Sequence, residues 1–189
     1  MRIIKSGLGI ISGFILLLSG SCSDTPSTRT ERLLKEWIGK EIVFPQDARF
    51  TVPAGGETAP FSEFDSYKVL AYIDSAGCVP CKLELPYWMQ FMREAEEKSP
   101  EKIDLLLVID TTPEKVARIN RMIAHTGFPH PVWFDENGSL DRENAFPKES
   151  AFHFFLLDKN NRVLSVGNPL SNSRIWENYI RVAAGRNCR

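Results

Sequence analysis

Two cysteines separated by two residues, Cys78 and Cys81, are the side chains of this sequence best suited to chemistry. They follow a nearly continuous apolar run, residues 68–74, and precede an amphipathic stretch that starts near Val79, so the pattern places them at the start of a helix. Free N–H groups and the helix dipole favour a thiolate there. A thiolate is the nucleophile of disulfide exchange. Because Cys81 stands one helical turn after Cys78, we predict that Cys78 attacks a substrate and Cys81 resolves the mixed disulfide.

The stretches around this motif alternate between patterns typical of strands and of helices. Apolar runs and turn residues predict strands at residues 41–44, 49–52, 68–74, 103–109, 131–134, 152–157 and 162–166. Apolar residues at helical spacing predict helices at residues 31–38, 79–98 (with a kink at Pro86), from Pro113 to just before Gly127, and 173–184. Alternating units give a parallel core, and the last two strands form an antiparallel hairpin. We therefore expect an α/β protein of thioredoxin-like fold, a central mixed sheet flanked by helices.

The residues that follow the first cysteine extend the motif. Residues 78–86 read CVPCKLELP and resemble the CxxCKxExP signature of TlpA-like and ResA-like thioredoxin-fold proteins. Residues 128–135 and 155–158 resemble two further segments of that family, so the resemblance runs over residues 69–166. It implies a membrane-tethered thiol-disulfide oxidoreductase of the bacterial cell envelope, whose partners are protein thiols or disulfides and which needs no cofactor.

The resemblance also implies a catalytic role for Glu84, the family's helix carboxylate near the cysteines. An anion beside a forming thiolate raises the thiol pKa, and the protonated acid can supply a proton. The alternative is that Glu84 is a solvated residue in the first turns of the helix. Cytoplasmic thioredoxins place a buried aspartate six residues before the first cysteine, and here that position is Tyr72.

One segment departs from the family pattern. The family carries a cis-proline opposite the cysteines, and the matching segment here, residues 152–158, begins with Phe152. A cis bond before a non-proline residue costs about 2.5–4 kcal/mol, so we expect this bond to be trans. His153 stands next to that point and either faces the cysteines or packs within its strand. We predict that substrate binds at Val79, Pro80, Phe152 and His153.

The N-terminal residues have the pattern of an export signal. Arg2 and Lys5 precede an apolar stretch at residues 8–18, which is too short to span a bilayer as an ordinary helix. Small residues then lead to Cys22, which resembles the lipid-accepting cysteine of bacterial lipoproteins. The alternative is an ordinary secretory signal that is cleaved near Ser21.

This pattern sets the expected organisation of the chain. We predict a lipoprotein signal peptide at residues 1–21, a flexible tether rich in Ser, Thr and Pro at residues 22–30, and a single thioredoxin-like domain with an N-terminal extension at residues 31–189. Lipid attached to Cys22 would hold the domain on a membrane, facing the periplasm.

Composition excludes several other classes. The 23 basic and 24 acidic residues give a net charge of -1, so no basic surplus favours nucleic acid as a partner. Apart from Cys22, Cys78 and Cys81, the chain has only Cys188 and three histidines, too few well-placed ligands to predict a metal site. Lys82 stands where a c-type haem motif needs histidine. The sequence does not indicate an oligomeric state.

The main alternative to an enzyme is a binding module. In that interpretation the thioredoxin-like domain binds a partner through its apolar surface, and the CxxC motif is a structural disulfide or a relic. Phe152 in place of the proline supports this alternative. The intact signature residues, Cys78, Pro80, Cys81, Glu84 and Pro86, favour the enzyme.

Overall fold

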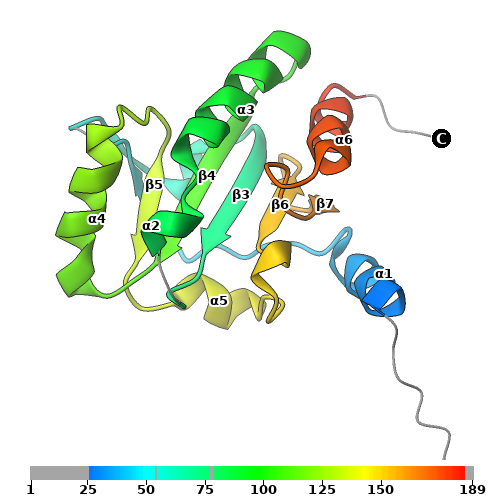
Figure 1. Cartoon of the computed structure of the whole chain (residues 1–189), viewed down its shortest axis with the longest axis horizontal. Helices are drawn as coiled ribbons and strands as arrows, with labels where there is room; N and C mark the ends of the chain where they lie inside the picture. Colours follow the sequence, from blue (N-terminus) through cyan, green and yellow to red (C-terminus); the bar gives the residue numbers. More distant parts are fainter. Residues whose placement is uncertain (1–25, 54, 77–78, 186–189) are drawn as a thin grey trace, which may run out of the picture.

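The structure is a computed structural model that describes residues 26–53, 55–76 and 79–185 (Figure 1). Its elements are, in order, α1 (Pro26–Trp37), β1 (Arg49–Thr51), β2 (Thr58–Pro60), η1 (Phe61–Glu63), β3 (Tyr67–Ile73), α2 (Val79–Lys82), α3 (Leu85–Lys98), β4 (Ile103–Asp110), α4 (Pro113–His125), β5 (Val132–Asp135), α5 (Ser139–Asn144), η2 (Ser150–Phe152), β6 (Phe154–Leu157), β7 (Val163–Val166) and α6 (Ser173–Ala183). The signal peptide and most of the tether predicted from the sequence lie outside the described residues. Residues 26–30, predicted as tether, are instead helical, because Pro26 fits the first turn of a helix.

The described strands form one mixed sheet of seven in the order β2-β1-β5-β4-β3-β6-β7. The central strands β5, β4 and β3 are parallel, and β6 and β7 add the predicted antiparallel hairpin beside β3. At the other edge, β1 pairs antiparallel with β5 and with β2, a strand that the sequence analysis did not predict. The expected α/β architecture with a mixed sheet is confirmed.

Helices cover both faces of this sheet. Val69, Ala71 and Ile73 of β3 face the core formed with α3, α4 and α6, whereas Leu70 and Tyr72 face the core formed with α1 and α5. Successive side chains of a strand point to opposite faces, so a strand covered on both sides is apolar throughout. This burial explains the continuous apolar run that marks β3 in the sequence.

The long helix predicted at residues 79–98 is two helices. The chain breaks at Glu84, whose backbone is left-handed with φ 44° and ψ 33°, so α2 is a single turn and α3 begins at Leu85. Pro86 causes the break, because it has no N–H to donate to the carbonyl of Lys82 and its ring would clash with that carbonyl. Pro86 thus disrupts the predicted helix, but the result is a complete break before Leu85 instead of a kink, and Pro86 occupies the first turn of α3.

Two further predictions about strands are corrected. Residues 41–44 are not a strand, and only Glu41 forms an isolated bridge, with Arg162. Phe152 and His153 precede β6 rather than belonging to it, because Phe152 closes the short 3-10 helix η2 through an N–H bond to the carbonyl of Glu149. The described residues contain no cis peptide bond, as expected for the bond before Phe152.

Candidate functional site

The described part of the CxxC motif, Val79 to Cys81, lies at the carboxyl edge of the parallel strands. β3 ends at Ile73, and the chain continues through Asp74 and a short loop into α2. Asp110 ends β4 and Asp135 ends β5, so three carboxylates follow three neighbouring strands at this edge. Ligands of open α/β sheets bind at this edge. Asp135 has a structural role, because its two carboxylate oxygens accept hydrogen bonds from backbone N–H groups in the first turn of α5.

Cys81 is exposed and disulfide-bonded. Its predicted partner Cys78 lies outside the described residues, so the pairing of these two cysteines stays a prediction. Between them, the Val79 side chain is buried in the core beneath α3, whereas Pro80 is exposed. Pro80 and Cys81 therefore form the accessible part of the described motif, whereas Val79 packs in the core.

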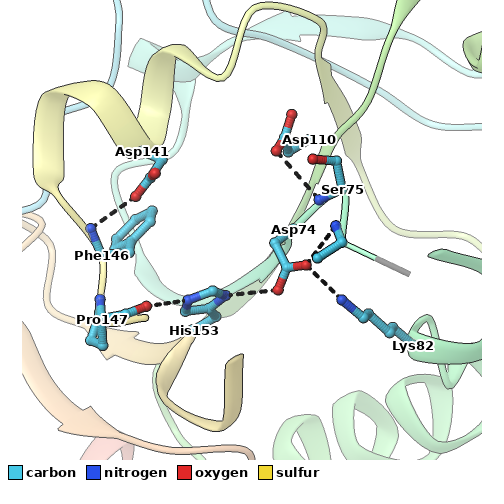
Figure 2. A network of polar contacts seen from close by, with 9 residues as sticks. Asp74, Ser75, Lys82, Asp110, Asp141, Phe146, Pro147 and His153 are labelled. Carbon is cyan, nitrogen blue, oxygen red and sulfur yellow. Dashed lines mark hydrogen bonds and ion pairs between the residues drawn. The ribbon is translucent and has the colours of Figure 1, made fainter. Parts of the chain in front are cut away.

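Asp74 is the polar centre of the site, and the sequence analysis did not single it out. Its Oδ1 accepts the Lys82 ammonium at 2.6 Å and the Ala76 N–H at 2.9 Å (Figure 2). Partial burial disfavours ionisation, but these hydrogen bonds outweigh it, so the pKa of Asp74 lies below its ordinary value. The available sequence signal was an acidic residue ending an apolar strand, with a lysine directly after Cys81.

His153 lies on the other side of Asp74. Its Nε2 is 2.6 Å from the carbonyl oxygen of Pro147, which can only accept, so Nε2 carries a proton. Its Nδ1 faces Oδ2 of Asp74 at 3.5 Å and makes no hydrogen bond within the described residues (Figure 2). The ring is buried edge-on against Tyr72. His153 is therefore a packed residue that contacts Asp74 at the end of β3, and its predicted role at the cysteines stays a prediction.

Tyr72 occupies the place of the buried aspartate of cytoplasmic thioredoxins. Its side chain is buried between Phe146 and His153. Burial, together with nearby carboxylates that include Asp110 and Asp74, raises the pKa of the Tyr72 hydroxyl far above its usual range. The hydroxyl therefore stays protonated at any physiological pH and supplies no base beneath the motif.

Glu84 lines two cavities beside the motif. The first, about 240 Å³, lies between the end of β3, the α2–α3 junction, η2 and the loop after β7; it is lined by Tyr72, Ile73, Asp74, Lys82, Glu84, Ser150, Ala151, Phe154, Asn168 and Ser171. The second, about 300 Å³, includes Cys81 and is lined by Pro80, Cys81, Leu83, Glu84, Leu85, Pro86, Met122 and Thr126. The break in the helix thus places the exposed Glu84 at the α2–α3 junction, where it lines both cavities.

Phe152 does not line either of these cavities. Its ring packs partly buried on the face of the sheet that carries α1, and it lines a separate groove with Leu34 and Ile38. Ala151 and Ser150 are the residues of its loop that reach the cavity containing Glu84. The role predicted for Phe152 opposite the cysteines stays a prediction.

The described ranges hold neither a metal-binding cluster nor a helix that could span a membrane. No group of three or more His, Cys, Asp or Glu side chains there is arranged to hold a metal ion. No helix of the described chain is both long enough and apolar enough to cross a membrane.

Comparisons with known proteins identify the architecture. No protein-family model matches the chain, and no curated protein matches it. Among solved structures, a candidate thiol:disulfide interchange protein DsbE from Chlorobium tepidum is similar at 20% identity and a TM-score of 0.56, covering 78% of this chain and 98% of that one. A thioredoxin-like protein from Porphyromonas gingivalis (14% identity, 79% and 97% covered, TM-score 0.54) and a thiol:disulfide interchange protein from a Bacteroides species (13%, 78% and 91%, 0.52) are also similar.

The chain has a thioredoxin-like fold. At these identities the similarity shows the fold alone. The loop before β6 contacts the end of β3 through His153 and Asp74. Ser150 and Ala151 of that loop line the same cavity as Glu84.

Proposed function

We propose that this protein is a thiol-disulfide oxidoreductase of the bacterial cell envelope that acts through Cys78 and Cys81. The observation that carries the proposal is the state of Cys81, which is exposed, disulfide-bonded and located in the helix that directly follows a central strand of a thioredoxin-like fold. A disulfide that is open to solvent at this edge can exchange with a second protein.

The reaction transfers two electrons. In the reducing direction, the Cys78 thiolate attacks one sulfur of a substrate disulfide, and the other substrate sulfur leaves as a thiolate that takes up a proton. The Cys81 thiolate then attacks the Cys78 sulfur, which breaks the mixed disulfide and releases the second substrate thiol. The substrate becomes a dithiol and the motif a disulfide, and the reverse sequence oxidises a substrate dithiol.

Glu84 is the proton carrier in this proposal. It is exposed and lines both the cavity that contains Cys81 and the cavity that contains Asp74, so it can exchange protons with solvent and with a thiol. Glu84 has a left-handed backbone although it is not a glycine, and this backbone directs the chain into α3. The family resemblance assigns the same residue the same role.

The substrate class is a protein thiol or disulfide. Of the residues predicted to contact it, Pro80 is exposed, whereas Val79 and His153 are buried. We therefore place substrate contact at Pro80 and at the loop of Ser150 and Ala151. Lipid attachment at Cys22 would hold the domain at the membrane, facing the periplasm.

Trapping of mixed disulfides tests the proposal. Full-length Cys81→Ser protein lacks the resolving thiol, so it should accumulate complexes with envelope proteins that a reductant releases. The matched Cys78→Ser variant retains Cys81 and should trap far less. If neither variant forms reducible complexes, or if Cys78→Ser traps as much as Cys81→Ser, the assigned roles are wrong.

A non-catalytic binding module is the second candidate. Phe152 stands in place of the proline, and its N–H bond to Glu149 is one that proline cannot make. A structural disulfide would have a reduction potential below about −300 mV and would not turn over. Measurement of the potential, together with turnover of a generic protein disulfide, separates the two candidates.

A further inference from the structure

We propose that Asp74 is a positioning residue that restrains the acidity of the CxxC thiols, because it neutralises Lys82 beside Cys81 and fixes the loop that leads to the motif. This inference rests on the proposed function and assigns a regulator to that site. Asp74 would touch neither substrate nor sulfur, and its effect would pass through Lys82 and through the loop backbone.

The first support is the number of segments that meet at one carboxylate. Oδ1 of Asp74 holds the Ala76 N–H of the motif loop and the Lys82 ammonium of α2, while Oδ2 faces His153 from the loop before β6 (Figure 2). Asp74 is thus the point at which α2 and the loop before β6 are joined to the end of β3.

The second support is that the ion pair is sheltered. The side chains of Asp74, Lys82 and His153 are 20%, 30% and 7% exposed, respectively. Solvent and salt screen such a group less than they screen a pair on the open surface. The charge on Lys82 is therefore held close to Asp74 and is only partly screened by water and ions.

The third support is the position of Lys82 in the sequence and in α2. It directly follows Cys81 in α2. A positive charge near a thiol stabilises the thiolate form, and at this separation along the chain the field of the ammonium can act on the Cys81 sulfur without contact. α2 is a single turn, so its dipole contributes less to thiolate stability than the long helix expected from the sequence would. Local charges consequently carry more of the control of thiolate stability, and Asp74 offsets the charge of Lys82.

The remaining charged groups around Asp74 do not replace this pairing. Glu84 lines the same cavity from the α2–α3 junction, and Asp110 at the end of β4 accepts the Ser75 N–H at 3.3 Å. Both are acidic, so neither can pair with Asp74. His153 can donate to Asp74 only when Nδ1 is protonated, because Nε2 already bonds to the carbonyl of Pro147.

Alkylation of the reduced full-length protein tests the inference. The rate of reaction with iodoacetamide is measured against pH in a Cys188→Ser background. Asp74→Asn removes the negative charge that neutralises Lys82. The pH at which the alkylation rate is half-maximal should therefore fall by about one unit. Lys82→Met removes the cation and should raise the midpoint. The midpoint of the variant that carries both Asp74→Asn and Lys82→Met should return close to that of the parent protein, because the two charges act as one pair.

Asp110→Asn is the matched control. Asp110 also ends a parallel strand and also holds the motif loop, but within the described residues it pairs with no cation. Its replacement should shift the midpoint by less than half as much. An unchanged or raised midpoint in Asp74→Asn, or an unchanged one in Lys82→Met, overturns the inference. Since alkylation needs no substrate, a shift without mixed-disulfide trapping would reject the proposed function while supporting the role of Asp74 as a charge.

Discussion

The side-chain amide of Asn144 bonds to both backbone groups of Val43. Its Oδ1 accepts the Val43 N–H at 2.8 Å, and its Nδ2 donates to the Val43 carbonyl at 2.8 Å and to the Leu140 carbonyl at 2.8 Å. Asn144 therefore provides the hydrogen bonds that a neighbouring strand would otherwise provide to Val43, just after the segment of residues 39–42 that bonds to residues 161–163.

Asn144→Ala should lower the free energy of unfolding by about 2–4 kcal/mol. The substitution leaves backbone groups of a partly buried segment without partners, and each such group costs about 1–3 kcal/mol. Urea unfolding measures the change. Asn137→Ala, in the exposed turn before α5, is the control and should change stability by less than about 0.5 kcal/mol. An equal effect of the two substitutions would contradict the role given to Asn144.

Glu84→Gly should stabilise the protein by up to about 1 kcal/mol, because glycine adopts the left-handed backbone of this position without strain. Gln90→Gly in the exposed face of α3 is the control and should cost about 1 kcal/mol. Thermal unfolding of the two variants measures both effects. A loss of stability in Glu84→Gly would mean that the carboxylate stabilises the fold more than the backbone strains it.

Glu84→Gln tests the carboxylate separately from the backbone. The isosteric amide cannot exchange a proton, so the rate of disulfide exchange should fall about tenfold or more, in the range seen for lost acid–base groups. Stability should stay near that of the parent protein. Disulfide exchange at the parental rate, with an unchanged pH profile, would mean that Glu84 is a solvated residue without a role in proton transfer.

Lys68→Met tests a buried cation at the opposite edge of the sheet. The Lys68 ammonium is buried and donates to the carbonyls of Ser66, Asp158 and Lys159. Burial lowers its pKa from the ordinary 10.5, although carboxylates nearby act in the other direction. Between the lowered pKa and 10.5 the unfolded chain binds a proton that the folded chain has lost.

This difference in proton binding fixes the sign of the pH dependence. The contribution of Lys68 to stability should rise as pH increases through that window. Lys68→Met should remove the rise, whereas the exposed Lys115→Met should keep it. Chemical unfolding at a series of alkaline pH values measures the slopes. Parallel curves for the parent and Lys68→Met would show that Lys68 keeps its ordinary pKa in the folded protein.

Cys22→Ala tests the proposed lipid anchor. The full-length protein should partition with membranes into detergent, and the substitution should block processing or release the protein. Cys188→Ala, which removes the other cysteine outside the motif, should leave partitioning unchanged. Mass spectrometry of the mature protein gives the direct answer, since an unmodified N-terminus after Ser21 would indicate an ordinary secretory signal.

Much of the fold followed from local patterns. The apolar runs marked β3 and β4 because strands buried on both faces have no polar side to interrupt them. Pro113 marked the start of α4, and the hairpin of β6 and β7 followed from two apolar runs joined by polar turn residues. The short strand β2 and the short helix α5 gave no such signal. Elements of this length depend on contacts with their neighbours for stability, and too few residues repeat in them to form a pattern.

The sequence by itself determined that two cysteines stand between a buried strand and a helix, because hydrophobic periodicity and the spacing of the motif are properties of neighbouring residues. Tertiary structure alone decided what surrounds them. Asp74 and His153 meet only because β6 pairs with β3 in one register, and Phe152 turns toward α1 because η2 rotates the chain before β6 begins. Contacts between residues far apart in the chain depend on the direction of each side chain in the packed fold, which a local pattern does not contain.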